Sequence, residues 1–265
     1  MGLDGVLRGR GKAVVGILNG VDYEEWSPEA DKLIPQRYTA TDLTGKEHCK
    51  QALLKRAGLP SLPNVPLIGI VSRLAGQKGF DLFPQALPRL LARERFQLIV
   101  TGSGERHFER MFRQLAATFP QQVRFNNAFD NEMAHWIEAG SDFFLMPSRY
   151  EPCGLNQMYS LRYGTVPVVR ATGGLYDTVR NFDRASGTGT GFTFEDYSSR
   201  ALLDTLRWAL SLYENKRVWR RIQAAGMRQD FSWDHSARQY VSVYERANGR
   251  DNGIRQDQNL HRQQL

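Results

Sequence analysis

The chain has 265 residues, of which 41% are hydrophobic and 24% charged, as in ordinary soluble globular proteins with a sizeable core, and no apolar run is long enough to span a bilayer. The net charge is +7, but the basic residues are spread along the chain, without the interleaved aromatic residues or zinc-ligand spacing of nucleic-acid-binding modules. We therefore expect neither a nucleic-acid nor a membrane partner, and the two cysteines, Cys49 and Cys153, indicate a reducing compartment without a disulfide framework.

The first sixty residues do not read as a domain of their own. Residues 13–18 (AVVGIL) form a strand-like run that ends in the turn Asn19-Gly20, and residues 26–45 are polar and contain proline. We expect that the chain begins inside a larger protein. Residues 1–25 would then be the end of a preceding domain and a crossover.

From residue 66 onward, short apolar strands alternate with amphipathic helices. Strands are expected at 66–71, 96–100, 123–126, 142–146 and 166–169, and helices at 80–91, 106–119, 131–139 and 154–163. Such alternation is typical of right-handed βαβ units. It predicts an α/β fold with a doubly wound, Rossmann-like parallel sheet.

The C-terminal part changes character after Phe194. Residues 199–247 are expected to form additional helices, broken near Asn215 and near Ser232, where Ser232 suits the start of a helix. We predict a Rossmann-like domain over residues 26–232 and a crossover helix over 233–247. Residues 248–265 are rich in Asn, Gln and Arg and are expected to be disordered.

Ligands of open α/β sheets bind beyond the carboxyl ends of the strands, and four loop segments are expected there. The first, SRLAGQKG (residues 72–79), carries Arg73 and Lys78, two cations that suit a diphosphate. Its alternative is an exposed loop with solvated charges. The second, TGSG (residues 101–104), allows a ligand to approach the backbone closely, and a simple tight turn explains it equally well.

The third segment, SRYEPCGLN (residues 148–156), places Glu151 before a helix expected to open at Gly154. A carboxylate there can bind sugar hydroxyls or stabilise an oxocarbenium ion, or it can simply cap the helix. Cys153 has no histidine nearby in the sequence, so we interpret it as a small packed residue. The fourth segment, TGGL (residues 172–175), is an anion nest or a plain turn.

Several motifs are absent from the sequence. There is no Asp-x-Asp pair, no Walker loop and no GxGxxG after a strand, and no two of the five histidines have metal-ligand spacing. We therefore expect no metal and no resident cofactor.

Taken together, the motifs resemble the glycogen/starch synthase family of ADP-glucose type, whose members have the two-domain GT-B glycosyltransferase architecture. The stretches that carry the resemblance are GILNGVDYEEWSP, SRLAGQKG, AGSDFFLMPSRYEPCGLNQMYSLRYGTVPVVRATGGLYDTV, GTGFTFED and DFSW. They lie in family order between Gly16 and Tyr244. The Lys-Thr-Gly-Gly-Leu loop and the histidine of the family's N-terminal domain are not in this sequence. The resemblance therefore implies only the C-terminal half of a GT-B enzyme.

The resemblance implies a retaining hexosyltransferase that moves glucose from ADP-glucose to an α-1,4-glucan acceptor. Arg73 and Lys78 would hold the donor diphosphate, and Glu151 would lie at the reacting face of the glucose. The other donor-binding residues would be Asn19, Phe129 (stacking on the base), Cys153, Gly154, Leu155, Asn156, Thr172, Gly173 and Gly174. Asn156 stands where the family commonly has threonine.

Two other functions remain open from the sequence. One is another GT-B transferase that uses a UDP- or GDP-sugar; many such enzymes have a second Glu eight residues after the first, where this chain has Tyr159. The other is a non-catalytic nucleotide- or glucan-binding module. Because GT-B catalysis needs a cleft between two domains, we expect the chain to be inactive without its N-terminal partner domain. A bacterial cytoplasm is expected, with plastid stroma as the alternative.

Overall fold

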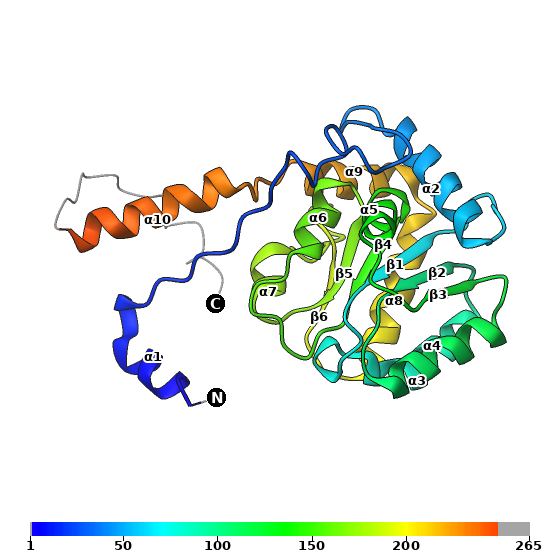
Figure 1. Ribbon diagram of the computed structural model, residues 1–265, viewed down its shortest axis with the longest axis horizontal. Helices are drawn as coiled ribbons and strands as arrows, with labels where there is room; N and C mark the ends of the chain where they lie inside the picture. Colours follow the sequence, from blue (N-terminus) through cyan, green and yellow to red (C-terminus); the bar gives the residue numbers. More distant parts are fainter. Residues whose placement is uncertain (1, 249–265) are drawn as a thin grey trace. The chain divides into compact units, whose positions relative to one another are not determined.

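The computed structural model describes residues 2–248 (Figure 1). The chain divides into two units, one of residues 21–230 and one that joins residues 1–20 to the segment from Phe231 onward. Of the tail expected to be disordered, residues 249–265 lie outside the described residues. None of the helices formed by residues 2–248 has the length and apolar character that crossing a bilayer requires.

The larger unit is built on one six-stranded sheet in which all paired strands run parallel. The strands are β1 (Leu67–Val71), β2 (Gln97–Thr101), β3 (Val123–Asn126), β4 (Phe143–Met146), β5 (Val166–Arg170) and β6 (Phe192–Phe194). Their order, β3-β2-β1-β4-β5-β6, reverses between β1 and β4, as in doubly wound folds. The predicted α/β, Rossmann-like fold is confirmed.

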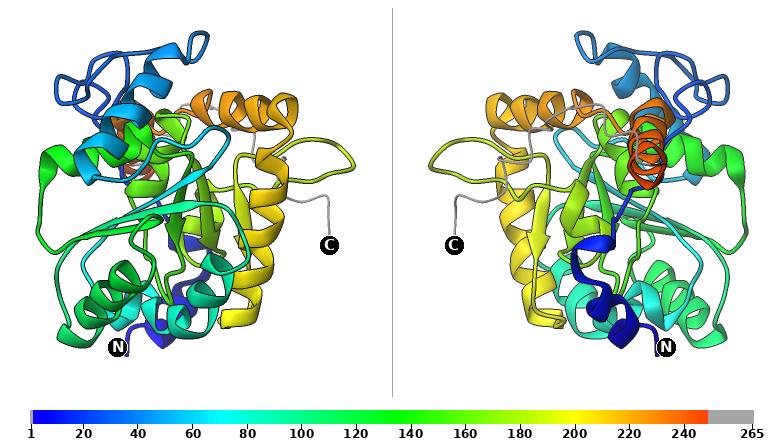
Figure 2. Two further views of the ribbon diagram at one scale, coloured as in Figure 1. Left: turned by 90° about the vertical axis from the view of Figure 1, so that its right-hand side faces the viewer. Right: turned by 90° about the vertical axis from the view of Figure 1, so that its left-hand side faces the viewer.

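Helices cover both faces of this sheet (Figure 1, Figure 2). They are α2 (Thr44–Ala57), α3 (Phe83–Leu91), α4 (Arg106–Thr118), α5 (Asn131–Gly140), α6 (Asn156–Arg162), α7 (Gly174–Thr178), α8 (Ser199–Tyr213) and α9 (Lys216–Met227). Two short 3₁₀ turns, η2 (Gly76–Lys78) and η3 (Phe80–Leu82), precede α3. The helix break expected near Asn215 is confirmed, because the Asn215 side chain caps α9 by accepting the Val218 N–H.

Side chains of the central strands alternate between two cores. In β4, Phe143 and Leu145 pack on the face covered by α3, α4 and α8, whereas Phe144 and Met146 pack on the face covered by α2, α5 and α7. This alternation follows from the two-residue period of a strand. Because both faces are buried, the strands read in the sequence as continuous apolar runs.

Helix α2 is absent from the sequence-based prediction. Its inward face carries Cys49, Leu53 and Leu54, but also Lys46 and Lys50, both of which are buried. Two lysines on the inner face hide the apolar periodicity from which a helix is recognised. The helix ends where Gly58 adopts a left-handed conformation with φ 63°.

The smaller unit contains α1 (Asp4–Arg10), the 3₁₀ turn η1 (Gly11–Ala13) and α10 (Trp233–Ala247). Ser232 starts α10 as predicted, since its side chain accepts the His235 N–H at 3.2 Å. The prediction of a strand at residues 13–18 is wrong, because the structure has no strand there. The described residues of this unit include no strand with which it could pair, and Val14 and Val15 are exposed.

Residues 21–43 contain little regular structure but are anchored within the larger unit by Asp31. The carboxylate accepts hydrogen bonds from His135 Nδ1, at 2.7 Å, and from the Tyr163 hydroxyl. Burial by itself would raise the pKa of Asp31, but these hydrogen bonds outweigh it and lower that pKa. Trp26 adds to the anchor by stacking on the His135 ring, with ring centroids 3.8 Å apart.

A buried ion pair joins α2 to the amino ends of the two central strands. Lys50 Nζ lies 2.7 Å from Asp142 Oδ2, and the same oxygen accepts the Leu67 backbone N–H at 2.8 Å. Lys50 also donates to the Val65 carbonyl at 2.9 Å. Asp142 therefore neutralises the buried Lys50 ammonium and also accepts a hydrogen bond from the first N–H of β1.

We predict that Asp142→Ala lowers the free energy of unfolding by about 3–5 kcal/mol, because it leaves the Lys50 ammonium buried without its counter-charge. Urea denaturation measures the loss. Asp204→Ala, which removes the exposed ion pair of Asp204 with Arg200 on α8, is the control and is expected to change stability little. Similar losses in the two variants would contradict this role for Asp142.

Candidate functional site

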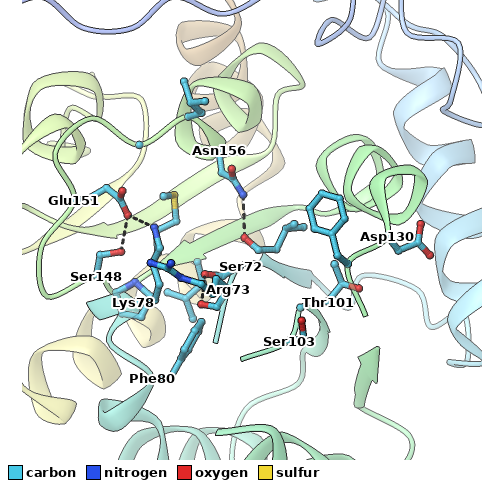
Figure 3. A pocket seen from close by; sticks show the side chains of 18 of the residues that line it. Ser72, Arg73, Lys78, Phe80, Thr101, Ser103, Asp130, Ser148, Glu151 and Asn156 are labelled. Carbon is cyan, nitrogen blue, oxygen red and sulfur yellow. Dashed lines mark hydrogen bonds and ion pairs between the residues drawn. The ribbon is translucent and has the colours of Figure 1, made fainter. Parts of the chain in front are cut away.

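A cavity of about 620 Å³ opens at the carboxyl ends of the central strands (Figure 3). Its lining includes Val71, Thr101 and Met146, the last residues of β1, β2 and β4. We call it the switch-point cavity, because the strand order reverses between β1 and β4. Doubly wound sheets bind their ligands in this crevice, and the volume lies within the range of about 300–1,000 Å³ found for small-molecule sites.

The cavity brings together most of the residues singled out in the sequence. Its lining includes Arg73, Lys78, Phe129, Glu151, Gly154, Leu155 and Asn156. Cys153, Thr172, Gly173 and Gly174 are not in the lining, but the two loops that carry them meet beside it: the Gly174 N–H donates to the Glu151 carbonyl at 3.1 Å. Asn19 belongs to the smaller unit, and its role at the site stays a prediction.

The central interaction in the cavity joins Lys78 to Glu151. Lys78 Nζ donates to Glu151 Oε2 at 2.6 Å, and the Ser148 hydroxyl donates to the same oxygen at 3.2 Å (Figure 3). Glu151 is only 7% exposed. The alternative that Glu151 caps the following helix is wrong, because α6 starts two residues after Gly154, at Asn156, and has no side-chain cap.

Arg73 and Lys78 are held on a loop that is tied to its neighbours by backbone hydrogen bonds. The Leu74 N–H donates to the Ser103 carbonyl at 2.9 Å, and the Arg149 N–H donates to the Gln77 carbonyl at 2.8 Å. Arg73 itself is exposed, and none of the described residues forms an ion pair with it. The loop therefore presents a fixed backbone and an uncommitted guanidinium to a ligand.

The glycines of the first two segments allow these loops to approach one another. Gly79 has φ 80°, and a Cβ on it would lie 1.9 Å from the Pro147 carbonyl oxygen. A Cβ on Gly102 would lie 1.8 Å from the Ser72 carbonyl oxygen. The TGSG segment also lines the cavity through Gly102 and Ser103, so it is both a close-packed turn and part of the site.

Phe129 and Asp130 also line the cavity, and Asp130 lies well apart from the Lys78–Glu151 pair in Figure 3. Phe129 is 89% exposed, so its ring is free to stack on a planar group. Sequence reasoning did not single out Asp130, which caps α5 by accepting the Met133 N–H at 2.9 Å and lies 3.7 Å from Arg56. The sequence could have identified Asp130 as a helix cap, because aspartate is a preferred residue directly before the start of a helix.

Residues 54–225 match the family model described as glycosyl transferases group 1. This span begins in α2, ends in α9 and includes all four loop segments predicted to form the site. The chain belongs to this family.

Within this family, the chain is similar to glycogen synthases and to a starch synthase. The chain is 54% identical over 246 residues to the glycogen synthase of Koribacter versatilis, covering 93% of this chain and 50% of that protein. It is 52% identical over 244 residues to the glycogen synthase of an Anaeromyxobacter species, covering 92% and 51%. The starch synthase IV catalytic domain of Arabidopsis thaliana, bound to ADP and acarbose, has 37% identity and a TM-score of 0.87, covering 94% of this chain and 52% of that one.

These relatives confirm the resemblance to the glycogen/starch synthase family. The chain spans about half of the length of each of them. It therefore matches one part of these longer relatives. The family match covers the sheet domain and its loops.

Two further side chains that the sequence analysis singled out have contacts within the domain. Asn156 donates from Nδ2 to the Val71 carbonyl at 3.0 Å and so ties α6 to the end of β1. Tyr159, eight residues after Glu151, stacks on Trp26 with ring centroids 4.0 Å apart. Burial raises the pKa of Tyr159 to about 12, so its hydroxyl stays neutral and supplies no second carboxylate-like charge.

We predict that Gly79→Ala lowers the free energy of unfolding by about 1–3 kcal/mol, because a side chain is strained at this positive φ and meets the Pro147 carbonyl. Urea denaturation tests it. Gly76→Ala, in the same loop, is the matched control: its φ is ordinary and nothing lies within 4 Å of the added Cβ. Equal stability of the two variants would show that the loop does not need the Gly79 conformation.

Proposed function

We propose that the chain is the donor-binding half of a retaining glucosyltransferase that moves glucose from ADP-glucose to the non-reducing end of an α-1,4-glucan. The observation that carries the proposal is the placement of Arg73, Lys78 and Glu151 together in the switch-point cavity. The similarity to glycogen synthases supports glucose as the transferred group.

The leaving group of such a reaction is a nucleoside diphosphate with about three negative charges, and two nearby cations in a recessed cavity would offset much of this charge. Arg73 has no competing ion pair among the described residues and would bind the phosphates in bidentate fashion. Lys78 has three N–H donors, so it can keep its bond to Glu151 and still donate to a phosphate oxygen. No metal ion is required in this scheme.

Glu151 would lie on the sugar side of the same lysine. Its carboxylate is positioned by Lys78 and Ser148, and it would stabilise the positive charge that develops on the glucose ring as the diphosphate leaves. Backbone groups of Cys153, Gly154 and Leu155 would contact the glucose hydroxyls. Thr172, Gly173 and Gly174, on the loop after β5, would lie near the glucose and the phosphates. We propose no covalent step through Cys153.

Adenine is the base we propose for the donor. The starch synthase IV domain that superposes on this chain is bound to ADP, which supports the choice. The exposed ring of Phe129 in the cavity lining offers an aromatic surface on which a base would stack.

The acceptor site and the second wall of the catalytic cleft would come from an N-terminal domain of the GT-B type. The chain spans about half of its glycogen synthase relatives, so the residues that bind the glucan are proposed to lie largely outside it. Asn19 would reach the glucose from the crossover between the two domains. We place the enzyme in a bacterial cytoplasm, which agrees with two unpaired cysteines.

We expect ADP to bind this chain more tightly than UDP in calorimetric titrations. Arg73→Ala and Lys78→Ala should each weaken ADP binding about 10- to 100-fold, the usual effect of losing a hydrogen bond to a charged group. Arg89→Ala, an exposed arginine on α3, is the control and should leave the affinity unchanged. Unchanged ADP affinity in both cavity variants would reject the proposed donor site, and preference for UDP would reject the adenine assignment.

The transfer reaction is tested by fusing the N-terminal half of the Koribacter versatilis glycogen synthase to this chain. The fusion should elongate glycogen from ADP-glucose, whereas the chain alone should show negligible turnover. Glu151→Gln in the fusion is expected to lower kcat about 100- to 1,000-fold, because it removes the charge that faces the reacting carbon.

Glu214→Gln, an exposed residue after α8, is the control for that substitution and should retain full activity. Full activity of the Glu151→Gln fusion would remove Glu151 from the catalytic machinery. Robust glucan elongation by the chain alone would show that it needs no partner domain.

A further inference from the structure

A second cavity, of about 480 Å³, lies at the opposite edge of the sheet from the switch-point cavity. It is lined by Asp142, directly before β4, and by residues of α2 and α9, which both lie in the upper part of Figure 1. We call it the amino-edge pocket and define it by six charged residues: Lys46, Glu47, Lys50, Asp142, Lys216 and Arg220. Nothing in the proposed glucosyl transfer uses it.

The charges of the amino-edge pocket do not balance. Four of its side chains are cationic and only two are anionic. Asp142 is paired with Lys50, as described above, and Glu47, which accepts a hydrogen bond from Gln51 at 2.8 Å, can offset only one of the remaining three cations. The pocket therefore keeps positive charge for which the described residues provide no counter-charge.

Lys46 is the most buried of the pocket cations that form no ion pair among the described residues. It is 6% exposed, and its Nζ donates to the Ala139 carbonyl at 2.9 Å and to the Thr165 hydroxyl at 2.6 Å. No carboxylate of residues 2–248 forms an ion pair with it, although an ammonium has three donors. Burial lowers its pKa to about 8, although the nearby charges of Asp142 and Glu138 act in the opposite direction.

Lys216 and Arg220 lie one turn apart in the first two turns of α9. Within the described part of the chain, neither forms an ion pair. The Lys216 ammonium is fixed 3.2 Å above the centre of the Tyr213 ring. Like charges at this spacing repel each other, and the positive end of the helix dipole adds to the repulsion. An anion bound between them would relieve it.

We propose that the amino-edge pocket is a second ligand site, which binds the phosphate group of a small molecule through Lys216 and Arg220 at its mouth and Lys46 in its wall. A phosphate carries close to two negative charges and several acceptor oxygens, which match two cations that form no ion pair and the neighbouring polar groups. Asn64, Ser61 and Gln51 supply such polar groups in the lining. The volume admits inorganic phosphate and also a sugar phosphate.

This inference is independent of the proposed transferase function, because the two cavities share no lining residue. Phosphate could nevertheless also bind Arg73 and Lys78, so the test uses the full chain with Arg73→Ala and Lys78→Ala as background. Inorganic phosphate and glucose 1-phosphate are titrated separately into this variant by calorimetry, in a phosphate-free buffer.

We expect at least one probe to bind with a dissociation constant of about 1 mM or less. Adding Lys216→Ala and Arg220→Ala should weaken binding by at least about tenfold, the effect of losing one charge-assisted hydrogen bond. The matched control adds Arg217→Ala, in α9, and Arg228→Ala, directly after α9, which remove the same charge from exposed positions outside the pocket lining. It should change the affinity by about twofold or less, because solvent and salt screen exposed charges.

Equal affinity for the two probes would assign the site to free phosphate, and tighter binding of glucose 1-phosphate would assign it to a sugar phosphate; both support the proposal. Absence of binding by both probes would overturn it. Equal weakening in the pocket and control variants would overturn it too, because diffuse surface charge would then explain the binding. Circular dichroism melts establish that each variant is folded. Since Lys216 and Arg220 are exposed, their removal should leave the melt unchanged.

Discussion

The parallel pairing of β1 with β4 at the centre of the sheet is the constraint on which both cavities depend. The chain leaves β1 toward β2 on one side and leaves β4 toward β5 on the other, so the loops after these strands diverge and a crevice opens between them. The loop that carries Arg73 follows β1 and the loop that carries Glu151 follows β4, so both border this crevice. At the other edge, the amino ends of the same strands are joined by Asp142.

One ion pair stands at each edge of the sheet, and the two have different physical consequences. The Lys50–Asp142 pair is deeply buried and its groups are occupied by the Val65 carbonyl and the Leu67 N–H, so it holds the structure together. The Lys78–Glu151 pair faces a cavity, and Lys78 is partly exposed with donors to spare. A buried charge that is fully satisfied stabilises the fold, whereas a recessed charge with unused donors can bind a ligand.

Most of the larger unit could be predicted from local patterns, and the exceptions have identifiable physical causes. The strands at 67–71 and 143–146 were recognised because they are buried on both faces and therefore apolar throughout. Helix α2 was missed because two of its inward positions are lysines, whose burial depends on partners far away in the chain. The apolar run at 13–18 resembles a strand, but a strand exists only where another can pair with it.

The amino-acid sequence was sufficient to identify the fold class, the three loops that line the switch-point cavity and the family. Each of these depends on residues that are close together in the chain, and βαβ topology brings the loop ends to one edge. Only the tertiary structure decided which side chains meet: Lys78 and Glu151 are 73 positions apart, and Lys50 and Asp142 are 92 apart. The same holds for Lys46 and Arg220, which share a pocket although they lie on different helices. Such contacts are set by strand order and by the direction in which each helix faces, and neither leaves a local pattern in the sequence.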